Sequence, residues 1–192
     1  MISKLEIWFR NLITAGILGD YTSEAVRKAL LINIFAFIGL IFIVIFSIKE
    51  IKLGERLIGI TAIIFGSATI INLIYFRLTK KHITAGLIIV FLMFMFSLFL
   101  LLFGDGDNKL LWFYVFPLLA YFILGTQNGG IINLILIVVT GFLVYFPFQG
   151  QPSIDPAFRE RFLASYIAVS GLAHVFELIR SRTYKAMLKA HH

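Results

Sequence analysis

The sequence predicts an all-α polytopic membrane protein with a six-helix transmembrane bundle. The 192-residue chain is 60% hydrophobic and only 14% charged, which is more apolar than a soluble domain of this size requires. Its apolar residues also form continuous runs of about fifteen to twenty residues, the length that matches a hydrocarbon core of ~30 Å. Membrane strands would alternate in polarity over about ten residues, so the spans are expected to be helices.

Six apolar runs can be drawn along the chain. They are Ala29–Ile48, Leu57–Phe76, Ile83–Phe103, Leu110–Leu124, Ile131–Phe148 and Phe162–Ile179. The fourth run, LLWFYVFPLLAYFILG, is short for a span and contains Pro117. A proline inside a helix removes one backbone hydrogen bond and predicts a kink. The helices either pack tightly around that kink, or the bend opens a cavity toward the outside or acts as a hinge during signalling.

Basic residues between the runs predict the orientation. Of the 17 lysines and arginines, 11 fall on the side that carries both termini and 6 on the other side, where Asp105 and Asp107 also lie. Because the more basic side normally faces the cytoplasm, both termini are predicted to be cytoplasmic, in a bacterial inner membrane. The first outer loop, KEIKLGER, carries three basic residues and is the weak point of this count.

The two ends of the chain differ from its middle. Residues 1–28 place Leu5, Trp8 and Leu12 at helical spacing, which predicts an amphipathic helix at the inner interface, either a plain anchor or a lateral sensor. The closing AHH is typical of an affinity tag, and suggests a piece of a longer protein. The predicted organisation is an amphipathic segment 1–28, a membrane sensory domain 29–180, the start of a signalling helix 181–190 and a tag remnant 191–192.

The last run passes into charged sequence without a glycine or proline. The last helix is therefore predicted to extend into the cytoplasm. A stripe of residues at alternating spacings of three and four follows one face, as the seam of a parallel homodimer would. These residues are Phe176, Ile179, Thr183, Ala186 and Ala190. The alternative is a charged stop-transfer tail.

No catalytic or cofactor motif is present in the sequence. There is no cysteine, which excludes disulfides and thiolate chemistry, and no nucleotide, hydrolase or metal-ligand motif occurs. The prediction is a non-enzymatic segment with no cofactor and no metal. The net charge of +7 is interpreted as topology and contact with anionic lipid rather than nucleic-acid binding.

Ionisable residues occur within the sixth run alone. His174 and Glu177 are three residues apart, with Ser170 and Tyr166 further up the same face. Such a pair can hydrogen-bond and answer to a ligand or to pH. The alternative is structural, with Glu177 reaching the interface and His174 packing on a neighbour; haem ligation with His82 is a remote third possibility.

Isolated polar residues occur within the apolar spans. In lipid such groups usually form hydrogen bonds between helices, although some could line a pocket for a small or lipophilic ligand. They are Asn33, Ser67, Thr69, Asn72, Ser97 and Asn133. If Asn33, Asn72 and Asn133 faced one another across water, a small transporter or channel would be favoured instead.

The second half of the chain resembles the membrane-associated sensory domains of bacteria, of the MASE type. The resemblance rests on GDGDNKLLWFYVFPLLAYFILGTQNGGIINLILI and FRERFLASYIAVSGLAHVFELIRSRTY, within about residues 95 to 185. It covers an acidic glycine-rich loop, Leu-Trp before an aromatic-proline pair, a glycine-bearing turn, Arg-Phe at the start of the last span and Glu-x-x-Arg at its end.

The resemblance implies a dimeric input domain in front of a diguanylate cyclase, histidine kinase or adenylate cyclase output module. Signals would pass down the last helix, where Arg180 is the transmission candidate. The sensing candidates are Asp105, Asp107, Trp112, Tyr114, Pro117, Tyr166, His174 and Glu177. The competing hypotheses are a transporter or channel and a scaffold that only dimerises and tethers an enzyme.

Overall fold

The computed structural model describes residues 24–104, 107–148 and 154–190, and all of its regular elements in these ranges are helices. Five helices there are long and apolar enough to cross a membrane, so the all-α membrane prediction is confirmed. The predicted interfacial helix lies mostly in residues 1–23, outside the described residues. The chain divides into two compact units, residues 1–96 and 97–192.

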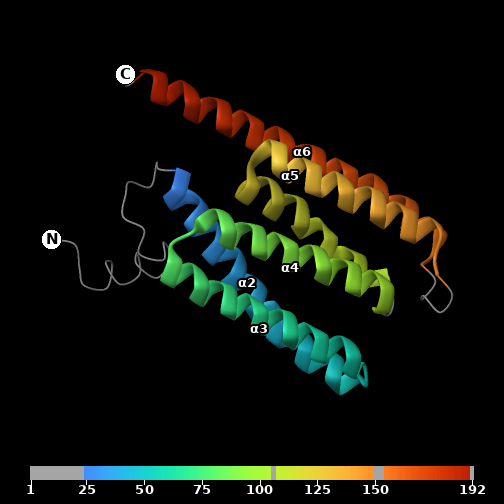
Figure 1. Ribbon diagram of the computed structural model, residues 1–192. Coiled ribbons are helices and arrows are strands. Elements are labelled where there is room, and N and C mark those ends of the chain that lie inside the picture. The colour runs from blue at the N-terminus through green and yellow to red at the C-terminus, as the bar shows by residue number, and fades with distance from the viewer. Residues whose placement is uncertain (1–23, 105–106, 149–153, 191–192) are drawn as a thin grey trace. The chain divides into compact units, whose positions relative to one another are not determined.

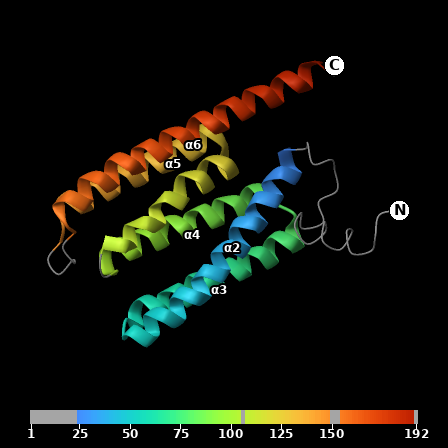
Figure 2. The same cartoon turned by 180° about the vertical axis from the view of Figure 1, so that it is seen from behind.

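The first unit contains α2 (Glu24–Leu53), α3 (Arg56–Thr79) and most of α4 (His82–Phe103). Helices α2 and α3 form an antiparallel pair joined at Gly54, whose φ of 95° favours glycine (Figures 1 and 2). A Cβ atom on Gly59 would lie 2.5 Å from Ile51 Cγ1 and 3.0 Å from the Ser47 carbonyl oxygen. The missing side chain at Gly59 therefore lets the two backbones approach closely, as small residues do in membrane helix pairs.

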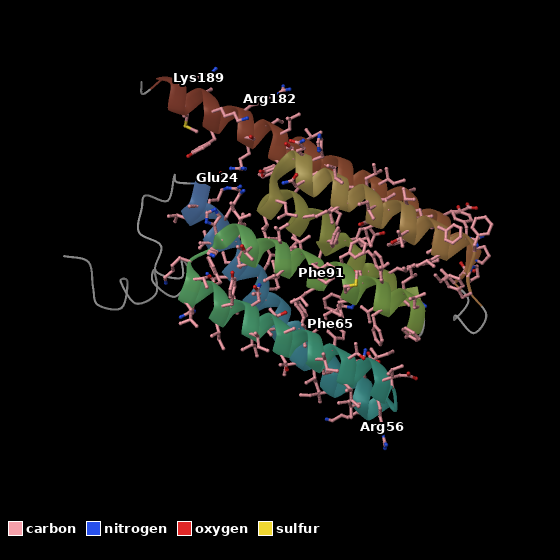
Figure 3. All side chains as sticks on the ribbon, viewed as in Figure 1. Glu24, Arg56, Phe65, Phe91, Arg182 and Lys189 are labelled. Atoms are coloured by element: carbon pink, nitrogen blue, oxygen red, sulfur yellow. The ribbon has the colours of Figure 1, made fainter. Side chains whose placement is uncertain are left out.

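Helix α3 meets α4 through a polar contact near the start of α4 and an aromatic contact further along it. The amide nitrogen of Asn72 donates to the Ala85 carbonyl at 3.0 Å, and the rings of Phe65 and Phe96 lie 5.2 Å apart. The connection between the two helices passes through Lys80 in the left-handed region, at φ 57°. Many large apolar side chains of this unit are exposed (Figure 3), which suits contact with lipid.

The second unit contains the end of α4, the 3₁₀-helix η1 (Asp107–Tyr114), α5 (Val115–Tyr145) and α6 (Pro156–Ala190). Helix α5 is interrupted at Gly125, whose φ of 83° and ψ of −178° are not helical. Beyond this residue the chain doubles back, and the second arm of α5 runs beside α6 (Figures 1 and 2). A Cβ atom on Gly129 would lie 2.6 Å from the Ala120 carbonyl oxygen, so the two arms touch at their backbones.

Helix α6 begins with a well-formed N-terminus. Asp155 accepts a hydrogen bond from the Phe158 backbone N–H at 2.9 Å, and Pro156 occupies the first helical position, where a missing N–H costs little. The helix then continues for 35 residues to Ala190 without interruption. At 1.5 Å per residue this is about 52 Å, some 20 Å longer than a hydrocarbon core.

Candidate functional site

The buried face of α6 is the centre of the second unit. It consists of Phe162, Tyr166, Ser170, Ala173 and Glu177, spaced as residues on one side of a helix are. Three of these five side chains are polar. Because polar groups within a membrane span are normally placed against partners, this face is the natural place to look for function.

Four aromatic rings pack where η1 meets α6. Phe113 and Tyr114 come from η1, and Phe162 and Tyr166 come from α6. Phe113 lies edge-on to Phe162 at 5.8 Å and to Tyr166 at 6.2 Å between centroids, the arrangement that aromatic quadrupoles favour. Phe113, Phe162 and Tyr166 are fully buried, so this aromatic cluster is a packed core rather than an open cage.

Two adjacent residues of α6 form hydrogen bonds to two different elements. The hydroxyl groups of Tyr114 and Ser165 are 2.5 Å apart, and Ser165 also donates to the Arg161 carbonyl at 2.6 Å. Because a serine hydroxyl has one proton, Tyr114 is then the donor to Ser165. One residue further on, the buried Tyr166 hydroxyl donates to Asn133 Oδ1 in the second arm of α5, at 3.1 Å.

The other end of this face is also polar. The imidazole of His174 packs against the ring of Tyr121, with centroids 5.3 Å apart and planes at 71°. The carboxylate of Glu177 accepts a 2.7 Å hydrogen bond from Arg180 Nε and a second one from Arg180 Nη2. Glu177 is 1% exposed and Arg180 24%. The Glu177 carboxylate is therefore buried against Arg180 of its own helix.

Pro117 is buried and lies in the first turn of α5, as its third residue. The interpretation of Pro117 as a kink in the middle of a span is wrong, because the helical angles of α5 break at Gly125 instead. The proline ring would clash with the carbonyl four residues earlier in an α-helix. The chain preceding it is 3₁₀, where the bonding pattern differs, so Pro117 marks the change from η1 to α5.

The remaining outer candidates are only partly described. Asp105 lies outside the described residues, and Asp107 opens η1 with a side chain that is also outside them. Trp112 is half-buried on η1. A residue that the sequence analysis missed is Lys109, which is 6% exposed and donates to the Gly104 carbonyl beyond α4 at 2.8 Å. The available signal was a lone lysine between an acidic loop and an apolar run. That lysine was used only in the count of basic residues that predicts the orientation.

Five of the six isolated polar residues donate or accept hydrogen bonds and divide into two groups; the buried Ser97 hydroxyl belongs to neither. Ser67 and Thr69 donate to carbonyl oxygens of their own helix, at 2.9 Å each, and Asn33 does the same at 3.0 Å. Asn72 and Asn133 instead bond to another helical segment, as predicted for interhelical contacts. In the ranges that the structure covers, no group of three metal-ligating side chains occurs.

A comparison with protein families gives a match over most of the chain. The family model of MASE6, a family of membrane-associated sensor domains, matches residues 21–187. The chain belongs to the MASE6 family. Neither a curated protein nor a solved structure matches it. The family match covers both units, although the resemblance in the sequence was evident in the second half alone. A MASE6 domain is a membrane sensory domain and is itself non-catalytic.

Proposed function

We propose that this MASE6 domain spans the membrane six times, forms a homodimer and passes a signal down α6 to a cytoplasmic output module. The observation that carries the proposal is α6 itself. It starts in the hydrogen-bonded aromatic cluster and continues as one helix to Ala190, well beyond the length that a membrane requires. A continuous helix transmits rotation or displacement along its axis, whereas a flexible linker does not.

The six-span count is supported by the shape of α5. The apolar stretch Lys109–Tyr145 has 37 residues, too many for a single crossing, and it doubles back at Gly125. The first arm, together with η1, covers about 31 Å, because eight 3₁₀ residues rise ~2.0 Å each and ten α residues 1.5 Å each. Two crossings then bring both termini to the more basic side, which is the cytoplasmic side of a bacterial inner membrane.

The homodimer contact is proposed along the exposed face of α6. The predicted seam residues Phe176, Ile179, Thr183 and Ala186 are all exposed, although Phe176 also touches Phe122 at 5.5 Å between ring centroids. Leu172, 73% exposed, continues the same stripe one step earlier. Together with Ala190 they form a 4-3-4-3-4 pattern, which a second copy of α6 would cover.

The input is proposed to act at the outer rim. Asp107, Trp112 and Tyr114 belong to η1, Asp105 precedes it in the sequence, and Pro117 lies in the first turn of α5. A small or lipophilic ligand, or a change in the bilayer, would act by stabilising one of two arrangements of these elements. His174, Glu177 and Arg180 lie near the end of the apolar part of α6, which is proposed to be the cytoplasmic end of the span.

A reporter fusion tests the proposal. An adenylate or diguanylate cyclase joined to the end of α6 is expected to change its activity when Asp105, Trp112 or Pro117 is replaced by alanine, with membrane level measured for each variant. Leu78→Ala, at a highly exposed position of α3, is the matched control. If the three variants and the control gave the same output under every stimulus tried, the input assignment would be wrong.

The transporter hypothesis is disfavoured by the contacts of the asparagines. Asn33 bonds to a carbonyl oxygen of its own helix, and Asn72 and Asn133 bond to another helical segment. Such bonds are typical of asparagines that pack between helices. Solute flux into proteoliposomes is expected to equal that of empty vesicles. For the scaffold hypothesis, the expected observation is different: the cyclase fusion would stay equally active in all variants and conditions.

A further inference from the structure

We infer that Ser165 is a coupling residue, and that the hydrogen bond between Tyr114 and Ser165 sets the position of η1 against the signalling helix α6. This inference rests on the proposed function and names the contact through which the outer rim would act on α6. The two hydroxyl groups come from residues 51 positions apart in the sequence. Their contact is a side-chain hydrogen bond between η1 and α6.

The neighbouring residue on α6 makes a different kind of contact. Tyr166 is fully buried and bonds to Asn133 of the second arm of α5, whereas the Tyr114–Ser165 bond lies at an exposed position. The Ser165 hydroxyl also bonds to the carbonyl oxygens of Arg161 and Phe162 in its own helix, so it keeps a partner when Tyr114 moves away. The Tyr166–Asn133 bond is therefore suited to hold α6 in place, and the Tyr114–Ser165 bond to open.

The conformation of η1 makes it the element that can move. It holds eight consecutive residues in 3₁₀ geometry, and runs longer than three or four residues are uncommon because their hydrogen bonds are poorer. Conversion of the six residues from Asp107 to Trp112 to α-helix would shorten η1 by about 3 Å and would shift Tyr114 relative to Ser165. Pro117 excludes Phe113 from a continuous α-helix, so η1 would have two forms, one entirely 3₁₀ and one with an α-helical start.

The test uses the full chain in lipid nanodiscs, with two introduced cysteines as spin-label sites. The chain has no cysteine of its own, so labels at Leu111→Cys on η1 and Met187→Cys on α6, in chain diluted with an excess of unlabelled chain, report one distance within the second unit. Both positions are exposed. The variants are Tyr114→Phe, Ser165→Ala and the double variant. Tyr145→Phe, which removes the hydroxyl of an exposed tyrosine, is the matched control.

The expected result is a second distance population in either single variant. Loss of one hydrogen bond should shift the balance of the two populations by roughly three- to fivefold relative to the control. The double variant should shift it no further, because both changes remove the same bond. Distances equal to those of Tyr145→Phe in all three variants would overturn the inference, as would shifts that simply add.

The cyclase fusion separates this inference from the proposed function. If inserting residues into the end of α6 changes cyclase output, while Tyr114→Phe and Ser165→Ala behave as Tyr145→Phe does, the coupling role of Ser165 is wrong and signalling through α6 stands. If insertions into α6 change nothing, the proposed function itself fails. The expected outcome is that insertions and both hydroxyl variants change output, with Tyr145→Phe at the wild-type level.

Discussion

The first and the second unit of this MASE6 domain differ in the contacts that stabilise each of them internally. In the first unit, α2 and α3 pack through small residues, Ser67 and Thr69 bond within their own helix, and Asn72 bonds to the backbone of α4. In the second unit, α6 bonds through Tyr114 and Asn133 to two other segments and carries a buried ion pair. Close backbone packing has one good geometry, whereas directional hydrogen bonds can be exchanged for others. The first unit therefore suits anchoring, and the second suits signalling.

The largest expected effect is at the chain reversal of α5. In Gly129→Ala, the new Cβ would lie 2.6 Å from the Ala120 carbonyl oxygen and 2.9 Å from Tyr121 Cα. Since these are backbone atoms, the arms must separate, and we expect a loss of about 3 kcal/mol or more in the free energy of unfolding. The measurement is unfolding in mixed micelles. Gly141→Ala, where the added Cβ meets nothing within 4 Å, should leave stability equal or higher.

The next effect concerns the buried carboxylate. Arg180→Ala removes the guanidinium that binds Glu177, and breaking a buried ion pair typically costs several kcal/mol, so we expect a loss of about 2–4 kcal/mol. The matched control is Arg182→Ala, two residues along the same helix and exposed (Figure 3), with a change within about 0.5 kcal/mol. Equal losses in the two variants, measured by the same unfolding assay, would contradict a structural role for the pair.

A smaller effect is expected at the contact that holds α6 to the second arm of α5. Tyr166→Phe keeps the ring in the aromatic cluster but leaves Asn133 Oδ1 without its donor. Loss of one buried hydrogen bond should lower stability by about 1–2 kcal/mol. Tyr145→Phe serves as the reference. A double-mutant cycle with Asn133→Leu should show non-additivity, and purely additive losses would contradict the contact.

The smallest effect is expected in the first unit. Ser67→Ala and Thr69→Val remove hydroxyl groups that bond only to carbonyl oxygens of α3 in the described contacts. Those carbonyls keep their helical hydrogen bonds, so we expect changes within about 0.5 kcal/mol. Thermal unfolding in detergent is sufficient for this comparison. A loss as large as that of Tyr166→Phe would remove the contrast between the two units.

The apolar runs predicted the membrane helices well, because the thickness of the hydrocarbon core sets the length of an apolar run. The ends of the runs at Ile48, Phe76 and Phe103 lie within or at the end of α2, α3 and α4. The break at Gly125 was signalled by the glycine-rich, polar turn GTQNGG. The 3₁₀ geometry of η1 was not predictable, since no sequence pattern distinguishes a long 3₁₀ run from the first turns of an α-helix.

The candidate site was predicted one residue at a time but not as pairs. Tyr114, Tyr166, Glu177 and Arg180 were singled out, and all four take part in hydrogen bonds. Asn133 was predicted to bond to another helix, but neither its pairing with Tyr166 nor the role of Ser165 was predicted, because the pairs span 33 and 51 residues and depend on how the arms of α5 fold against α6. The spacing of His174 and Glu177 suggested a pair. Instead, Tyr121 packs against His174 and Arg180 binds Glu177.

In the proposed function, α6 carries the signal as a rigid helix. The most direct test inserts one to four alanines after Ala190, in front of a fused cyclase. Each added residue turns the output module by ~100° and moves it by 1.5 Å. Cyclase activity should then rise and fall with a period near 3.6 residues. Activity that stays constant, or that falls steadily with each insertion, would contradict this role of α6.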